Sequence, residues 1–235
     1  EDMVATTKRH PSRTHHRTAV DRDGRLLGME IDFVIDGGAY CTLSPVVLSR
    51  GTIHASGPYF CPNIRISGRA VATNVPPHGA FRGFGAPQSI FALERHMDRV
   101  AEAVGLAPEE LRRRNFIRPG QVSAVGQVMR DQVDMGAILD RALELSDFHA
   151  KRARFAVATS GSRLRRGIGF ATFMHGAGFT GSGEDHLASI VSANLDARRS
   201  AVDQAGSVGG SECRISRGDL DDVQVKGGKV VNRRV

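Results

Sequence analysis

The chain has 235 residues, of which 40% are hydrophobic and 24% charged, a balance typical of globular domains and not of disordered chains. Its net charge is +7, but the arginines occur in short, scattered runs without interleaved aromatic residues, so we expect no nucleic-acid role. No apolar run approaches the roughly 20 residues of a membrane helix. The three cysteines are too widely spaced to indicate a disulfide framework or a zinc site, and we expect a reducing, cytoplasmic location.

The N-terminal part of the chain has the alternating pattern of strands. Residues 17–36 predict a β-hairpin, because an Asp-Gly pair supplies the positive φ of a tight turn between two alternating runs. Residues 39–63 contain three prolines and are predicted to be irregular. Residues 64–73 alternate again, which predicts another strand, and residues 76–87 form a loop rich in Gly and Pro.

Helical periodicity begins after this loop. Residues 88–104 predict an amphipathic helix that has a proline in its first turn and ends at a glycine. Its apolar face consists of Ile90, Leu93, Met97, Val100 and Val104. Shorter helices are predicted over residues 108–116, over Met135–Ser146 behind the capping residue Asp134, and over residues 148–157.

The C-terminal third changes character along its length. Ser160–Ser162 predicts a linker, and two strand-like runs follow it at residues 168–174 and 187–193. Residues 196–218 are polar with weak periodicity, and residues 223–235 predict a hairpin across a Lys-Gly-Gly-Lys turn. Strands, then helices, then further strands predict an α+β fold.

One loop is chemically distinctive: residues 78–88 read HGAFRGFGAPQ. Its glycines let the backbone pass close to another group, Arg82 is its only charged residue, and the helix after it presents N-terminal N–H groups that suit an anion. These features fit a loop that contacts a phosphate, a pterin or an oxo-metal group. They also fit a tight connection in which glycine permits the turn and Phe84 fills the core.

Residues 81–88, FRGFGAPQ, closely resemble the FRGFGxPQ signature of molybdenum hydroxylases of the xanthine dehydrogenase/aldehyde oxidase family. Three further segments resemble the same family: Glu1–Met3 with Arg9–Pro11, Pro62–Arg65 and Arg112–Asn115. The similarity covers residues 1 to about 194. It implies part of the molybdopterin-binding large subunit, with a first cofactor-binding region in residues 1–160 and the start of a second in residues 161–235.

The resemblance also implies roles for single residues. The backbone of Arg82 matches the position at the molybdenum centre, with Phe81 and Gly83 beside it at the cofactor. Phe84 matches the aromatic ring that stacks on a planar substrate, and Phe179 and Thr180 fall where the family places a second aromatic and a threonine. Arg50 lies 32 residues before Arg82, as does the substrate-orienting arginine of the family, whose guanidinium stabilises negative charge that develops on the substrate.

A second Gly-rich stretch, residues 176–181, spells the GxGxxG pattern of dinucleotide-binding loops. That pattern needs a helix after it and an acidic residue about 20 positions later, whereas a strand-like run follows here. We therefore expect no dinucleotide, and we interpret the stretch as backbone that presents Phe179 and Thr180. His78 and His175 flank the two Gly-rich loops and are expected to be structural.

The family's activity is oxidative hydroxylation, here of a small-molecule substrate that is a purine-like N-heterocycle or an aldehyde. The resemblance implies a molybdenum–molybdopterin cofactor, with FAD and [2Fe-2S] centres on other domains or subunits, and a hetero-oligomer with iron–sulfur and flavin subunits. The family's basic glutamate belongs to a segment that these residues do not include, and residues 195–235 depart from the family pattern. We therefore expect a fragment of such an enzyme; the alternative is a catalytically incomplete module that only binds a partner subunit.

Overall fold

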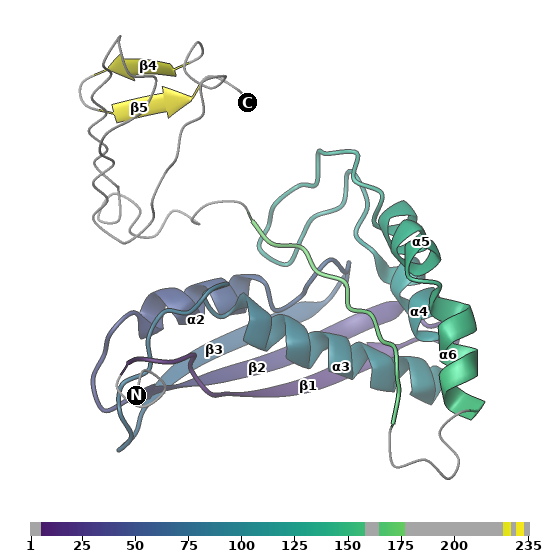
Figure 1. Cartoon of the computed structure of the whole chain (residues 1–235), viewed down its shortest axis with the longest axis horizontal. Helices are drawn as coiled ribbons and strands as arrows, with labels where there is room; N and C mark the ends of the chain where they lie inside the picture. The colour runs from purple at the N-terminus through teal and green to yellow at the C-terminus, as the bar shows by residue number, and fades with distance from the viewer. Residues whose placement is uncertain (1–5, 158–164, 177–222, 227–228, 233–235) are drawn as a thin grey trace. The chain divides into compact units, whose positions relative to one another are not determined.

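The computed structural model describes residues 6–157, 165–176, 223–226 and 229–232. The chain divides into two compact units, Glu1–His175 and Gly176–Val235. Within the described residues, the first unit contains a three-stranded sheet and the helices α2 to α6 (Figure 1). The predicted α+β class is therefore confirmed.

The sheet is built around its central strand. Strands β1 (Ser12–Val20), β2 (Leu26–Gly38) and β3 (Ile64–Ala72) lie in the order β1-β2-β3. The β1–β2 pair is antiparallel and is the predicted hairpin, with Gly24 at φ +78° in its turn. The β2–β3 pair is parallel, as the alternating run at 64–73 allows, and it therefore requires a crossover between the strands.

That crossover contains a helix, α2 (Ser44–Ile53), where the sequence predicted irregular structure. The prediction was wrong because it treated every proline as a helix breaker. Pro45 lies in the first turn of α2, where the missing N–H costs no intrahelical hydrogen bond. The helix packs against β2 and β3, and its neighbour α3 lies beside it over the sheet (Figure 1).

The remaining predicted helices are confirmed within a residue or two. They are α3 (Ala86–Val104), α4 (Pro108–Asn115), α5 (Met135–Leu145) and α6 (Phe148–Val157). The Asp134 side chain caps α5 by accepting from the Ala137 amide at 3.0 Å, as predicted. The side chain of Asn115 joins the end of α4 to the β-hairpin, since it accepts from the Leu26 amide and donates to the Gly24 carbonyl.

The core lies between the inner face of β2 and the helices. Met29 and Ile31 of β2 pack with Leu93 and Met97 of α3 in one buried cluster. The other half of the strand belongs to a second, smaller cluster consisting of Phe33, Ile35 and Val47, with Phe84 packed against it. One strand therefore holds α3 and α2 side by side, and this fixes the loop from which α3 begins.

The run at 168–174 is extended but is not a strand, contrary to the sequence prediction. Its burial alternates as in a strand, with Ile168, Phe170 and Thr172 turned inward. No strand pairs with it among the described residues. Side chains of the helices hold it instead. The predicted alternation of buried and exposed side chains is therefore correct, whereas the predicted pairing with another strand is not.

The second unit has one described element, the antiparallel pair β4 (Val223–Lys226) and β5 (Lys229–Asn232). This pair confirms the hairpin predicted at residues 223–235. The linker expected at 160–162, the strand expected at 187–193 and the polar stretch 196–218 lie outside the described residues. Among the helices that are described, none is both long and apolar enough to cross a membrane.

Candidate cofactor and substrate site

The loop before α3 is a tight turn built from three consecutive residues with positive φ. Gly83, Phe84 and Gly85 have φ values of +90°, +47° and +91°. The Phe84 amide donates to the Phe81 carbonyl at 2.9 Å, which closes the turn. Glycine adopts such angles without strain, whereas Phe84 does not. Residues 81–85 of the signature sequence therefore form a compact turn, the knuckle, that leads directly into α3.

This loop lies against helix α2 in backbone contact. A Cβ atom on Gly85 would overlap the carbonyl oxygen of Val47, and one on Gly51 would lie 3.2 Å from the Gly85 carbonyl oxygen. Only glycine permits an approach this close. Because Arg50 precedes Gly51, the residue predicted to orient the substrate lies on the helix that touches the signature loop.

Arg9, from the segment before β1, also binds the signature loop. Its guanidinium donates to the Arg82 carbonyl at 2.8 Å and to the Gln88 side chain at 3.2 Å, and it lies 4.7 Å from the centre of the Phe81 ring. The carbonyl of Arg82 is therefore held by a charged donor. The sequence had indicated Arg9 only as part of a segment resembling the family.

The free donors of this site belong to the loop and not to the helix end, where the sequence had placed them. The amides of Ala86, Gln88 and Ser89 donate to the carbonyls of Gly83 and Gly85, so the first turn of α3 is satisfied internally. In the described part of the chain, no protein acceptor meets the amides of Arg82 and Gly83. The Phe81 side chain beside them is 50% exposed.

Phe84 contributes to the core, whereas its stacking on a substrate stays a prediction. Its ring is half-buried and packs against the cluster of Phe33, Ile35 and Val47, as the core-filling alternative expected. In the chain Phe84 lies between Gly83 and Gly85, so the core contact of its ring also fixes the exposed turn around it.

Arg50 is a buried cation at the end of α2, with a relative exposure of 6%. Its Nη1 atom lies 3.5 Å from Nε2 of His175, and its carbonyl oxygen lies 2.8 Å from Nδ1 of His54. The rings of His54 and His175 stack, with their centres 4.8 Å apart. Burial lowers the pKa of His54, which keeps a second positive charge away from Arg50.

Comparison with known proteins gives the family of the region that contains this loop. A family model described as a molybdopterin cofactor-binding domain matches residues 1–116. The nicotinate dehydrogenase large molybdopterin subunit of Eubacterium barkeri is 39% identical over 144 residues, which cover 61% of this chain and 34% of that protein. A probable xanthine dehydrogenase subunit of Bacillus subtilis is 39% identical over 178 residues, which cover 76% of this chain and 23% of that protein.

The chain belongs to the xanthine dehydrogenase/aldehyde oxidoreductase family of molybdenum hydroxylases. The structure of aldehyde oxidoreductase from Desulfovibrio gigas superposes with a TM-score of 0.60 at 36% identity, over 67% of this chain and 17% of that one. The chain thus spans about a third or less of the length of these relatives.

The amides of Arg82 and Gly83 give this molybdenum hydroxylase domain donors that fit a pterin or oxo group. Such a group accepts hydrogen bonds, and the glycines leave the backbone open to a close approach. The structure thus brings Phe81, Arg82, Gly83 and Phe84 together in one loop, against the helix that carries Arg50. Phe179 and Thr180, the other predicted substrate residues, lie outside the described residues.

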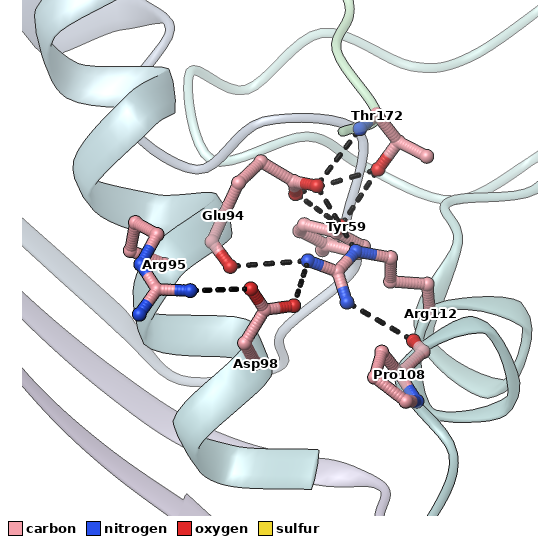
Figure 2. Close-up of polar contacts among 7 residues, drawn as sticks. All are labelled: Tyr59, Glu94, Arg95, Asp98, Pro108, Arg112 and Thr172. Carbon is pink, nitrogen blue, oxygen red and sulfur yellow. Dashed lines mark hydrogen bonds and ion pairs between the residues drawn. The ribbon is translucent and has the colours of Figure 1, made fainter. Parts of the chain in front are cut away.

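A buried polar network lies further along α3 (Figure 2). The carboxylate of Glu94 accepts from Nε of Arg112 at 3.0 Å, from the Thr172 amide at 2.8 Å and from the Tyr59 hydroxyl. Arg112 also donates to Asp98 at 2.9 Å, so its charge is shared between two carboxylates. Burial and the neighbouring Glu94 carboxylate raise the pKa of Tyr59 well above its ordinary value.

Sequence analysis missed Glu94, Tyr59 and Thr172 as members of this buried network. The only available signal was an acidic residue next to Leu93 and Met97, on the apolar side of a predicted helix. An acidic residue at such a position needs a buried cation as a partner. The sequence did not say that Arg112, one of three adjacent arginines, was that partner.

Proposed function

We propose that this domain contributes the signature loop and a substrate-orienting arginine to a molybdenum hydroxylase. That enzyme would oxidatively hydroxylate a small N-heterocycle, purine-like, or an aldehyde. The observation that carries the proposal is the contact between the signature loop and helix α2, which carries Arg50. A buried cation, Arg50, lies on the helix that packs directly against the knuckle with the unpaired amides of Arg82 and Gly83.

The molybdenum–molybdopterin cofactor would be held by Phe81, Arg82 and Gly83, and when bound it supplies the oxygen and redox chemistry. The backbone of Arg82 would lie nearest the metal, because its carbonyl is fixed by Arg9 and its amide is unpaired. In this proposal residues 1–160 form the first cofactor-binding region and residues 161–235 begin a second. FAD and [2Fe-2S] centres would lie on other domains or on partner iron–sulfur and flavin subunits, in the cytoplasm.

The substrate would lie against Phe84, with Phe179 and Thr180 completing its pocket. Arg50 would act as a catalytic residue by donating hydrogen bonds to a ring carbonyl, where negative charge develops as the ring is attacked. A guanidinium stays positively charged throughout, so it stabilises the charged state more than the ground state. An aldehyde has no such second carbonyl and would gain less from Arg50.

Two relatives support the heterocycle over the aldehyde. One is named for nicotinate and the other for xanthine, and both of these molecules are nitrogen heterocycles that carry additional acceptor oxygens. The third is named as an aldehyde oxidoreductase, which keeps the aldehyde as the other substrate class.

Arg50→Met in the assembled enzyme tests this proposal. We expect turnover of a keto-purine to fall roughly 100-fold, as when one transition-state donor is removed, with a much smaller loss for a simple aldehyde. Arg17→Met, which removes an exposed arginine of β1, is the matched control and should leave both rates unchanged. Equal losses on the two substrates would rule out the assignment of Arg50.

The alternative is a catalytically incomplete module that only binds a partner subunit. The chain spans at most 34% of the length of the proteins compared above, so the activity of the whole enzyme stays a proposal. Molybdenum content after co-expression with cofactor-assembly enzymes and candidate partner subunits separates the two. Retention of about one molybdenum per chain supports the hydroxylase, and a stable complex without molybdenum supports the binding module.

A further inference from the structure

In the part of the chain that the structure describes, residues 165–176 make none of the strand-to-strand hydrogen bonds that usually fix an extended backbone. They cross α3 as an extended segment, drawn in green in Figure 1, with no ladder to a strand of the described sheet. Their position must therefore come from side-chain contacts. Three of these are apparent: Ile168 and Phe170 pack against the main core, and the Thr172 amide meets Glu94 at 2.8 Å.

Glu94 is the centre of this attachment. Its side chain is 6% exposed, and that of its partner Arg112 is fully buried, so the pair lies in a medium where charged hydrogen bonds are strong. The Thr172 amide donates to Glu94, and the Thr172 hydroxyl lies 2.7 Å from the Tyr59 hydroxyl and 3.4 Å from the Glu94 carboxylate. Arg112 also lies 5.0 Å from the centre of the Phe170 ring, so the network holds Phe170 as well as Thr172.

His175 follows Thr172 by three residues, so the attachment of Thr172 also limits the position of His175 beside Arg50. His175 lies 3.5 Å from the guanidinium of Arg50 and stacks on His54. The helix that holds Thr172 through Glu94 is the same α3 that begins at the signature loop. A single rigid element therefore sets the position of the loop and of the segment that carries His175.

We propose that Glu94 is a positioning residue of the site: its carboxylate fastens residues 165–176 to α3 and so sets His175 against Arg50. This role rests on the function proposed above for Arg50. The contact between Nη1 of Arg50 and Nε2 of His175, at 3.5 Å, limits the rotation of the guanidinium. Glu94 itself touches neither substrate nor cofactor.

Glu94→Gln in the full 235-residue chain is the principal test. The amide keeps the volume of the side chain but has one acceptor oxygen, so either Arg112 or the Thr172 amide loses its partner. We expect hydrogen exchange of the Thr172 amide to rise roughly 10- to 100-fold, as for loss of a hydrogen bond to a charged group. The ¹⁵N signals of the His175 ring should shift with it, which a loss of global stability alone would not produce while the chain stays folded.

Asp98→Asn is the matched control. Asp98 is the other carboxylate that binds Arg112, at 2.9 Å, and it makes no contact with Thr172. We expect it to leave both readouts near their wild-type values. Should Glu94→Gln fail to fold, Tyr59→Phe removes only the hydroxyl shared by Glu94 and Thr172 and should move both readouts in the same direction, by less.

Unchanged protection of Thr172 and an unchanged His175 signal in the folded variants would overturn the positioning role. Kinetics of the assembled enzyme then distinguish the positioning role of Glu94 from the substrate role proposed for Arg50. If both hold, Glu94→Gln lowers turnover of the keto-purine relative to the aldehyde, as Arg50→Met does. If Arg50→Met affects the two substrates equally while Thr172 still loses protection, the attachment stands and the substrate role of Arg50 fails.

Discussion

Buried and half-buried histidines are the residues of this domain that depend most directly on pH. His16 of β1 stacks on His96 of α3 with ring centres 4.8 Å apart, and neither nitrogen of His16 has a hydrogen-bond partner. Burial, and then the neighbouring His96 and His15, lower the pKa of His16 from 6.5 to about 4. Burial also lowers the pKa of other histidines, namely His10, His54 and His96.

These shifts predict that acid destabilises the domain. A folded-state pKa below the unfolded value means that the unfolded chain binds more protons between pH 6.5 and about 4. The stability contributed by neutral His16 is therefore complete above pH 6.5, is lost as the pH falls toward 4, and changes little below that. We expect His16 to account for on the order of 1–2 kcal/mol of this loss, allowing for partial solvent screening.

The measurement is urea unfolding at a series of pH values for wild type and His16→Phe. The substitution keeps an aromatic ring against His96 and removes the titrating group, so the slope of unfolding free energy against pH should flatten. His15→Phe, at the exposed neighbour on the opposite side of the strand, is the control and should retain most of the slope. A slope in His16→Phe equal to that of wild type would contradict the assignment.

Single residues also show how far sequence reasoning reached. Arg50, Arg82 and Phe84 could be assigned because a contiguous signature and a spacing carried them. Arg9 and Glu94 could not, because each acts on residues more than seventy positions away in the sequence: Arg9 on the Arg82 carbonyl and Glu94 on the Thr172 amide. Contacts of that kind depend on the fold, and no local pattern records them.

At the scale of elements, the contact between α2 and the signature loop matters most. The sequence predicted the strands on both sides of α2 and the whole of α3, but it left α2 itself as irregular structure. Its residues have no marked amphipathic pattern, because α2 buries a mixture of small, apolar and charged side chains: Ser44, Val47, Arg50 and Gly51. A helix of this composition is specified by its packing against β2 and the loop, which only the tertiary structure supplies.

Gly85→Ala tests that contact. The new methyl group would meet the Val47 carbonyl oxygen at a position where φ is already +91°, so α2 and the loop must separate. We expect a loss of about 3 kcal/mol or more in unfolding free energy, from the strained backbone together with the overlap.

Gly105→Ala is the matched control for this substitution. Gly105 ends α3 at φ +71°, and nothing lies within 4 Å of the Cβ it would gain. It therefore carries the backbone strain without the overlap, and we expect a loss of about 1 kcal/mol. Equal losses for the two variants, measured by urea unfolding, would mean that the close approach of α2 and the loop contributes nothing.

On the scale of the whole molecule, the family assignment and the structure describe different extents of chain. The family match ends at residue 116, yet the core continues beyond it: Leu139, Leu143 and Phe148 are buried in the same cluster as Met29 and Leu93. The described residues of the first unit therefore form one packing unit that includes α5, α6 and the segment 165–176. The cofactor-binding motif is accordingly one part of a larger folded unit.

This continuity predicts where the chain can be shortened. A chain of residues 1–176 keeps every packing contact that the described residues make in the main core, so we expect it to fold alone. A chain of residues 1–157 loses Ile168 and Phe170 from that core and the Thr172 amide from Glu94. The cost should be about 2–4 kcal/mol, since apolar surface is uncovered and a buried carboxylate loses a donor.

Urea unfolding of the two shortened chains at neutral pH measures the difference directly. The Glu94→Gln substitution, made in both, shows where the difference arises. In 1–176 it should lower the unfolding free energy more than in 1–157, because only the longer chain presents the Thr172 amide to the carboxylate. If 1–157 is as stable as 1–176, the segment merely lies on the surface of α3, and the buried Glu94–Arg112 pair is sufficient without it.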